Sequence, residues 1–254
     1  MDDPFGEMLR DALAELTGVG PRPTLGGVYP RPTIEIIERD DGYVNGVPAI
    51  RYLASPEDWY AFEHRALERL SGHVLDIGVG GGRFALAAQD RGLTVTGLDI
   101  SPGTVEVAAA RGVRDTVCAT VDEHANSGRR YDTFALFGNN LGLLESRERA
   151  PVFLAALAAM ARPGARIVAQ GTNPYQTTDQ AHLAYHERNR ARGRMAGQLR
   201  LRIRYRRLAS EWFDYLVCTP DELAGLLSGT AWRLSDVDDA DPPFYVATMS
   251  FTGA

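Results

Sequence analysis

The sequence predicts an α/β fold with a mostly parallel sheet and helices on both of its faces. From residue 73 onward, short apolar segments rich in β-branched residues alternate with segments of helical periodicity. A glycine-rich turn joins the first predicted strand to the helix after it. Parallel neighbours need crossover helices, which bury the sheet on both sides. The predicted strands of this region are 73–78, 94–100, 115–121, 131–138 and 165–171, with helices over 83–92, 102–112 and 146–161.

The segments outside this alternation predict additional elements. The first 70 residues indicate an amphipathic helix over 5–17, a Gly- and Pro-rich linker over 18–33, two strand-like runs within 33–53, and a helix over 56–70 that is capped by Ser55. The end of the chain predicts a helix over 219–229 and a closing strand pair over 232–238 and 244–251. We therefore expect an N-terminal helical cap or lid over 1–70, a core over 71–171 and 219–254, and an inserted helix/β-hairpin lid over 172–218.

Length, composition and net charge limit the classes of protein to which this chain can belong. A chain of 254 residues can form one elaborated domain, and its net charge of -6 argues against general attraction to nucleic acid. No run of residues is long and apolar enough to span a membrane, and the N-terminus lacks the pattern of a secretory signal. We expect a cytoplasmic monomer or homodimer with no membrane partner and no metal. The two cysteines, Cys118 and Cys218, are interpreted as buried thiols.

The strongest motif lies at the first predicted strand and turn. Asp76 is still on the strand, and Gly78, Gly80 and Gly82 follow at alternate positions. A dinucleotide-binding turn would require a glycine where this chain has Arg83. The D-x-G-x-G-x-G arrangement resembles motif I of class I S-adenosylmethionine-dependent methyltransferases. The resemblance implies a Rossmann-like, seven-stranded fold, S-adenosyl-L-methionine as cofactor and S-adenosyl-L-homocysteine as product.

The resemblance extends to the ends of the following strands and covers residues 70–170, with 219–251 in outline. It implies that Asp99 accepts hydrogen bonds from the ribose hydroxyls and that Ile100 packs on the adenine. It also implies an acid near the adenine amino group after the third strand and a substrate-facing loop after the fourth. These further positions are Val121, Asp122, Gly138 and Asn139.

Candidate residues for binding or activating the methyl acceptor lie in the N-terminal segment and the insertion. In the predicted polar helix of the insertion, His182 and His186 share one face, with Tyr185 between them. One of these three could act as a general base, although surface histidines are equally compatible with the pattern. The aromatic cluster before the core could cover the cofactor or belong to the core of the N-terminal helix. Its members are Tyr43, Trp59, Tyr60, Phe62 and His64.

Arginine alternates with apolar residues over 199–206, which predicts a strand with one arginine face. Three interpretations remain open: a solvated face on an edge strand, recognition of an anionic acceptor, and RNA binding. The following run, 210–218, is the expected antiparallel partner, and its Glu211 and Asp214 could pair with these arginines.

The sequence therefore favours methyl transfer to a small-molecule O or N acceptor, and we expect a role in bacterial specialised metabolism. Residues 138–146 lack the Asn/Asp-Pro-Pro-Tyr/Phe motif of base-methylating relatives, which argues against base N-methylation. Three alternatives stay open: an RNA or protein methyltransferase, a catalytically silent cofactor-binding subunit, and a nicotinamide-dependent oxidoreductase.

Overall fold

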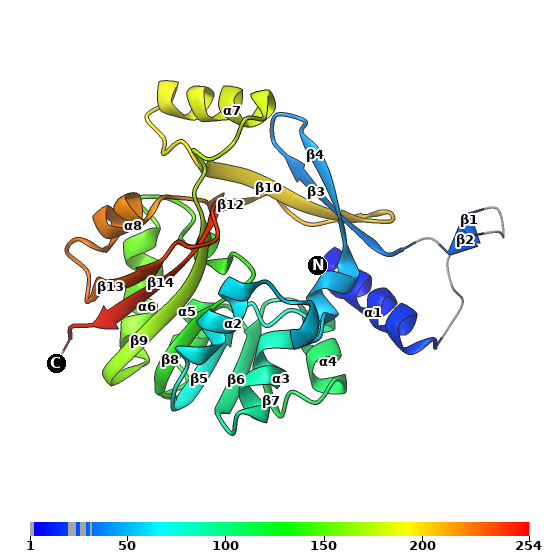
Figure 1. Cartoon of the computed structure of the whole chain (residues 1–254), viewed down its shortest axis with the longest axis horizontal. Coiled ribbons are helices and arrows are strands. Elements are labelled where there is room, and N and C mark those ends of the chain that lie inside the picture. The colour runs from blue at the N-terminus through cyan, green and yellow to red at the C-terminus, as the bar shows by residue number, and fades with distance from the viewer. Residues whose placement is uncertain (1–2, 20–23, 26–28, 31, 254) are drawn as a thin grey trace.

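The computed structural model describes residues 3–19, 24–25, 29–30 and 32–253. The predicted linker over 18–33 lies partly outside these residues. Figure 1 shows two parts, a large sheet flanked by helices and a smaller sheet with a helix above it. Within the described residues, no helix is both long and apolar enough to cross a lipid bilayer.

The large sheet has seven strands in the order β13-β14-β9-β8-β5-β6-β7. The pairs from β9 to β7 are parallel, whereas β14 pairs antiparallel with both β9 and β13. The predicted α/β fold with a mostly parallel seven-stranded, Rossmann-like sheet is confirmed. The strands are β5 (His73–Ile77), β6 (Thr94–Asp99), β7 (Asp115–Cys118), β8 (Tyr131–Leu136), β9 (Ala161–Thr172), β13 (Trp232–Asp238) and β14 (Phe244–Phe251).

Helices cover both faces because successive strand residues point to opposite sides. Val74 joins a buried cluster with residues of α2 and α3, whereas the adjacent Leu75 joins a cluster with residues of α6 and α8. The helices of this part are α2 (Ala61–Glu68), α3 (Arg83–Asp90), α4 (Pro102–Ala110), α5 (Val121–Ala125), α6 (Ala150–Ala159) and α8 (Pro220–Leu227).

The N-terminal segment and the insertion share a second sheet, which we name the lid sheet. Its order is β11-β10-β3-β4, and β12 also pairs with β10. The strands are β3 (Ile34–Arg39), β4 (Val44–Pro48), β10 (Gln198–Tyr205), β11 (Leu208–Ala209) and β12 (Phe213–Leu216). Above it lies α7 (Gln180–Ala191), and α1 (Pro4–Thr17) packs beside β10 and α4 (Figure 1). The short elements β1 (Thr24–Leu25), β2 (Tyr29–Pro30), η1 (Ala49–Leu53), η2 (Pro56–Asp58) and η3 (Asn140–Leu144) complete the chain.

Three local predictions are wrong. The expected helix over 56–70 begins only at Ala61, because Trp59 is extended and its buried indole donates to the Ala54 carbonyl at 3.2 Å. The third strand of the core ends at Cys118, because Thr120 already caps α5. Cys118 is exposed at that strand end, whereas Cys218 is buried as predicted.

The arginine strand β10 is also not an edge strand. It pairs with β3 on one side and with β11 and β12 on the other. The predicted antiparallel partner is confirmed as β12, where Arg200 lies opposite Asp214. The edge interpretation failed because the second neighbour, β3, comes from a distant part of the chain.

Candidate functional site

The glycine turn between β5 and α3 has the conformation that its sequence predicts. Gly78, Gly80 and Gly82 have φ angles of 72°, 53° and 78°, a region that side-chain-bearing residues rarely adopt. A Cβ on Gly78 would overlap the Asn140 amide, whereas one on Gly80 would meet open space up to the Tyr52 ring, 4.0 Å away. The turn therefore presents bare backbone to open space at Gly80.

Asp99 closes the next strand beside this turn. Its two carboxylate oxygens accept hydrogen bonds from the backbone N–H of Ser101 at 3.0 Å and of Gly80 at 3.2 Å. These bonds fix the orientation of the carboxylate. Burial nevertheless raises the pKa of Asp99 to about 6. The structure thus brings the predicted ribose acid and the glycine turn together.

Asp76 lies behind the turn with only 4% of its surface exposed. Burial raises the pKa of Asp76 to about 7, the Arg83 charge lowers it, and the neighbouring Asp99 charge raises it further. Two buried carboxylates at one turn create a site that favours positively charged groups and hydrogen-bond donors.

The other predicted cofactor positions lie farther out along the same edge. Ile100 is 72% exposed, so its side chain is free to pack on a ligand. Val121 and Asp122 are in the first turn of α5 rather than on a strand, and Asp122 is exposed.

The loop after β8 is tied to the glycine turn by a residue that the sequence reasoning passed over. The Asn140 amide donates to the carbonyls of Ile77 at 2.9 Å and of Gly78 at 3.1 Å. Before it, the Gly138 N–H donates to the Gln170 side chain at 3.0 Å, and Asn139 accepts from Thr172 at 3.0 Å. Two adjacent asparagines at a strand end were the signal that could have identified this link.

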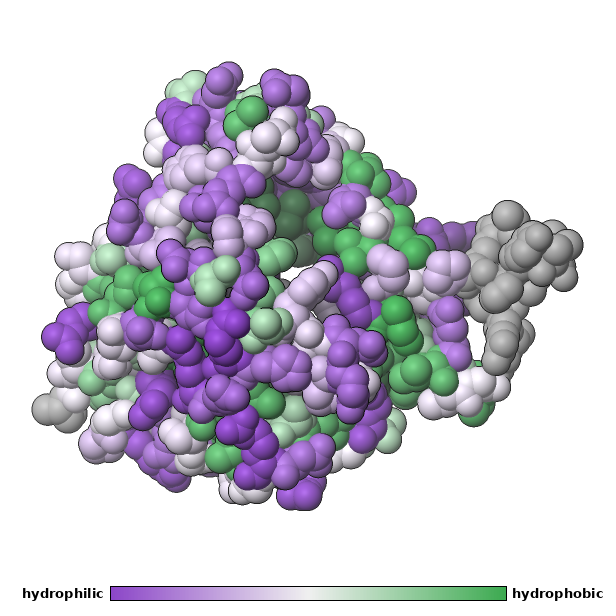
Figure 2. Space-filling view, viewed as in Figure 1, coloured by the Kyte–Doolittle hydropathy of each residue, from purple (hydrophilic) through white to green (hydrophobic). Residues whose placement is uncertain are grey.

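The lid sheet meets the glycine turn through residues that no motif had singled out. Tyr52 of η1 packs over Gly80 and Gly81, and its hydroxyl donates to Glu35 of β3 at 2.6 Å. Tyr215 of β12 donates to the Asn139 carbonyl at 2.6 Å. Figure 2 shows a hollow between the upper and lower parts of the molecule, with hydrophobic residues on its walls.

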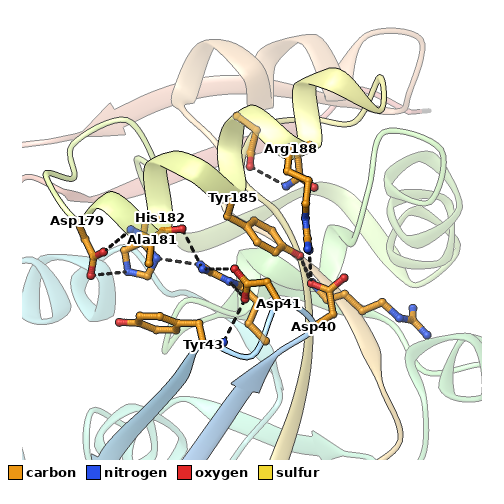
Figure 3. A network of polar contacts seen from close by, with 12 residues as sticks. Asp40, Asp41, Tyr43, Asp179, Ala181, His182, Tyr185 and Arg188 are labelled. Carbon is orange, nitrogen blue, oxygen red and sulfur yellow. Dashed lines mark hydrogen bonds and ion pairs between the residues drawn. The ribbon is translucent and has the colours of Figure 1, made fainter.

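Two of the three candidate bases in α7 belong to a network with the β3–β4 hairpin (Figure 3). The Tyr185 hydroxyl donates to Asp40 at 2.7 Å and accepts from the Arg200 N–H at 3.2 Å. His182 Nδ1 lies 2.9 Å from the Arg39 guanidinium, which also pairs with Asp41 at 2.8 Å. These contacts join the hairpin to α7, and they involve neither the glycine turn nor Asp99.

His186 lies on the same helix with 5% of its surface exposed. Its ring stacks edge-on against Tyr175 at 6.2 Å, and its Nδ1 has no hydrogen-bond partner among the described residues. Burial and the Arg190 charge lower its pKa. A catalytic role for His186, His182 or Tyr185 stays a prediction. The structure shows His182 and Tyr185 in contacts that join α7 to the hairpin.

Replacing Tyr185 with Phe therefore tests a structural role. We expect Tyr185→Phe to lower the free energy of unfolding by about 1–3 kcal/mol, since Asp40 and the Arg200 N–H each lose a partner. Chemical denaturation followed by circular dichroism measures this change. Tyr175→Phe is the control, because the Tyr175 hydroxyl contacts Glu222 on the surface. Equal stabilities of the two variants would contradict the assignment.

The aromatic cluster before the core divides between core and surface. Trp59 and Phe62 are buried and pack against Phe84 and Phe244, respectively. Tyr60 is 66% exposed. The core interpretation is confirmed for Trp59 and Phe62, and Tyr43 instead stacks on His182 at the hairpin.

The arginines of β10 pair with acids of the neighbouring strands. Arg202 and Arg204 pair with Glu38 of β3 at 2.8 and 3.1 Å, and Arg200 pairs with Asp214 of β12 at 3.2 Å. The predicted pairing with Asp214 is thus confirmed. The face is a cross-strand charge lattice rather than a row of unpaired cations.

Comparison with known proteins agrees with this geometry. A family model described as a methyltransferase domain matches residues 74–164. The structure is similar to that of an S-adenosylmethionine-dependent methyltransferase from Bacteroides fragilis in complex with S-adenosyl-L-homocysteine, with a TM-score of 0.80 and 21% identity over 99% of this chain and 95% of that chain. It also resembles CalS10, an amino pentose methyltransferase from Micromonospora echinaspora, with a TM-score of 0.54 and 15% identity over 80% and 95% of the two chains.

A third similar structure is the 1,6-didemethyltoxoflavin-N1-methyltransferase of Burkholderia thailandensis, with a TM-score of 0.50 and 23% identity over 75% of each chain. At these identities the structural similarity shows the fold. The family model includes the glycine motif, because both contain the first strand of the core and the turn after it. Residues 74–164 therefore match a methyltransferase domain, and the chain has the fold of these S-adenosylmethionine-dependent methyltransferases.

Proposed function

We propose that this chain is an S-adenosylmethionine-dependent methyltransferase that acts on a small-molecule O or N acceptor by in-line displacement, catalysed mainly by positioning. The observation that carries the proposal is the set of contacts that the lid sheet makes. Its arginines are paired with Glu38 and Asp214, and a hollow lies beneath it (Figure 2). Tyr52 and Tyr215 connect the lid sheet to the glycine turn and to the loop after β8. A hollow suits a small ligand, whereas arginines that are already paired with carboxylates are less available to RNA phosphates.

We further propose that Asp76, Gly78, Gly80, Gly82 and Asp99 hold the cofactor. The bare backbone of the turn leaves room for its methionine part, and the fixed Asp99 carboxylate suits the two ribose hydroxyls. When bound, the cofactor supplies a methyl group already activated by the sulfonium. The outer positions of the proposed site are Ile100, Val121, Asp122, Gly138 and Asn139.

Cofactor affinity should depend on pH through the two buried acids. We expect the affinity for S-adenosyl-L-methionine to fall as pH drops from about 8 to about 5, because Asp76 and Asp99 take up protons near pH 7 and 6. The ligand-free protein should show the opposite trend. Since both pKa values lie above the usual carboxyl range, its folded state binds more protons than its unfolded state, and its stability decreases as pH rises from about 4 to 7.

Calorimetric titration and thermal unfolding across this pH range measure the two trends. Asp99→Asn should remove the lower step of the affinity profile. If affinity and ligand-free stability changed in the same direction between pH 5 and about 7, the assignment of the two carboxylates would fail.

The acceptor class can be tested without knowing the acceptor. Purified enzyme and cofactor labelled with tritium in the methyl group are incubated with a bacterial cell extract that has been separated by size. We expect label in the fraction of low molecular weight. Label that precipitates with RNA or protein would contradict the proposal. Absence of label from every fraction, despite normal cofactor binding, would favour a silent partner subunit.

We propose a role in bacterial specialised metabolism together with a cytoplasmic location. One similar protein supports this role, because CalS10 is involved in calicheamicin biosynthesis. We propose that the enzyme works as a monomer or homodimer without nucleic-acid or membrane partners.

A further inference from the structure

Glu35 is a buried carboxyl group that the cofactor site does not use. It lies on β3 with 2% of its surface exposed, and its Oε2 accepts the Tyr52 hydroxyl at 2.6 Å. Glu63, which is buried to a similar degree, is neutralised by Arg83, but Glu35 forms no ion pair with any described residue. A buried carboxylate without a cation is costly, so its retention indicates a ligand that supplies charge or hydrogen-bond donors.

Glu35 lies beside Tyr52, which links the lid sheet to the glycine turn. Tyr52 packs over Gly80, and Tyr215 reaches the loop after β8. The charge of Glu35 also raises the pKa values of both tyrosines, so the carboxyl group lies within electrostatic reach of each. Glu35 is therefore hydrogen-bonded to one of the two phenol rings that connect the lid sheet to the large sheet and is electrostatically coupled to the other.

The register of the lid sheet determines which side chains share a face with Glu35. Residues directly opposite each other in antiparallel strands point to the same face. Glu35 shares its face with Ile37, which lies opposite Ile203 of β10. Farther along the same face Leu201 lies opposite Phe213 and Leu199 opposite Tyr215. The other face carries Glu38 and the paired arginines. The Glu35 face also carries Arg39 at the end of β3, opposite Leu201, but its guanidinium is paired with Asp41. Around Glu35 this face thus combines apolar side chains, two phenol rings and one carboxyl group, which together suit an amine attached to a hydrophobic group.

We propose that Glu35 binds the amino group of a hydrophobic amine acceptor and takes a proton from it before methyl transfer. This inference rests on the proposed function and specifies its substrate class. The bound ammonium first gives one proton to the Glu35 carboxylate. The neutral nitrogen then forms the bond to the methyl carbon with its lone pair, while the carbon–sulfur bond breaks and its electrons go to sulfur. The methylated product leaves as an ammonium ion, and Glu35 loses its proton to water. Tyr52 is a positioning residue that orients the carboxylate.

The local electrostatics support this role. Burial raises the pKa of Glu35, while the Tyr52 hydrogen bond and the Arg51 charge lower it. A carboxylate with a raised pKa is a better base near neutral pH than an exposed one. The charged and titratable groups around it are Tyr52 and Arg51 of η1 and Tyr215 of β12. Arg51 is exposed, so water screens its charge.

The test uses benzylamine as probe and the full-length enzyme saturated with S-adenosyl-L-homocysteine. Glu35→Gln keeps an oxygen for Tyr52 and removes the charge. Glu38→Gln is the matched control, since it changes the same residue type on the opposite face of the same strand. We expect wild type and Glu38→Gln to bind benzylamine in an NMR titration, and Glu35→Gln to bind it about 10- to 100-fold more weakly. Benzyl alcohol should bind wild type and Glu35→Gln equally.

A titration of wild type from pH 8 to about 5 provides a second test that needs no variant. Benzylamine affinity should fall as Glu35 becomes protonated, while the probe itself stays charged. Absence of saturable benzylamine binding, or equal binding by Glu35→Gln and wild type, would overturn the inference. Loss of S-adenosyl-L-homocysteine binding in Glu35→Gln would also overturn it, because Glu35 would then serve the cofactor. Failure of the proposed function would appear separately, as label on RNA or protein in the extract experiment.

Discussion

Asp99→Ala should weaken S-adenosyl-L-homocysteine binding by roughly 100-fold or more while leaving the protein folded. The carboxylate is the proposed acceptor for two ribose hydroxyls, and each charge-assisted hydrogen bond contributes about 1.5–3 kcal/mol. The variant also removes the acceptor of the Gly80 and Ser101 N–H groups, which orient the turn. Stability should change little, because a carboxylate whose pKa is raised by burial is itself costly to keep charged.

Isothermal titration calorimetry measures the affinity, and thermal unfolding without ligand measures the stability. Asp90→Ala is the control, because Asp90 is exposed at the far end of α3. It should bind S-adenosyl-L-homocysteine like wild type. If Asp99→Ala kept wild-type affinity, the cofactor would have to lie elsewhere.

Gly78→Ala should lower both stability and cofactor affinity. A left-handed backbone costs a residue with a Cβ about 1–2 kcal/mol, and Gly78 has a φ of 72°. The new methyl group would also displace the Asn140 amide, which holds the turn to the β8 loop. Together we expect about 2–4 kcal/mol of lost stability and no detectable S-adenosyl-L-homocysteine binding at micromolar ligand.

Gly92→Ala separates the effect of backbone strain from the effect of displacing the Asn140 amide. Gly92 has a φ of 81°, yet a Cβ there would meet no described atom within 4 Å. It should lose about 1–2 kcal/mol of stability from backbone strain alone and keep wild-type cofactor affinity. Denaturant unfolding and calorimetry on both variants give the comparison. Equal losses of stability with intact binding in both would show that the Asn140 contact is unimportant.

The geometry of the proposed cofactor site was predictable because its determinants are contiguous. A strand, three alternate glycines and a helix start lie within about ten residues, so the backbone conformation follows from residues that are neighbours in sequence. The position of Asp99 beside the glycine turn was also predictable, since the carboxyl ends of adjacent parallel strands meet at one edge. Val121 was wrongly predicted on a strand, because Thr120 and Glu123 form a capping box that begins α5.

The acceptor half was not predictable from these rules. His182, Tyr185 and His186 attracted attention as polar side chains on one helix, but the structure uses the first two to join α7 to the β3–β4 hairpin. Glu35, Tyr52 and Tyr215 showed no motif. They come together only because η1, β3 and β12 converge over the glycine turn.

The sequence alone thus determined the large sheet, its helices and the chemistry of the glycine turn, because strand–turn–helix units are encoded by local periodicity and backbone constraints. Only the tertiary structure determined which strands pair in the lid sheet. Arg202 and Glu38 are 164 positions apart, and backbone hydrogen bonds between strands are the same for every pair of partners. Which strands pair therefore depends on burial and on charge pairs such as this one, which neither segment reveals by itself.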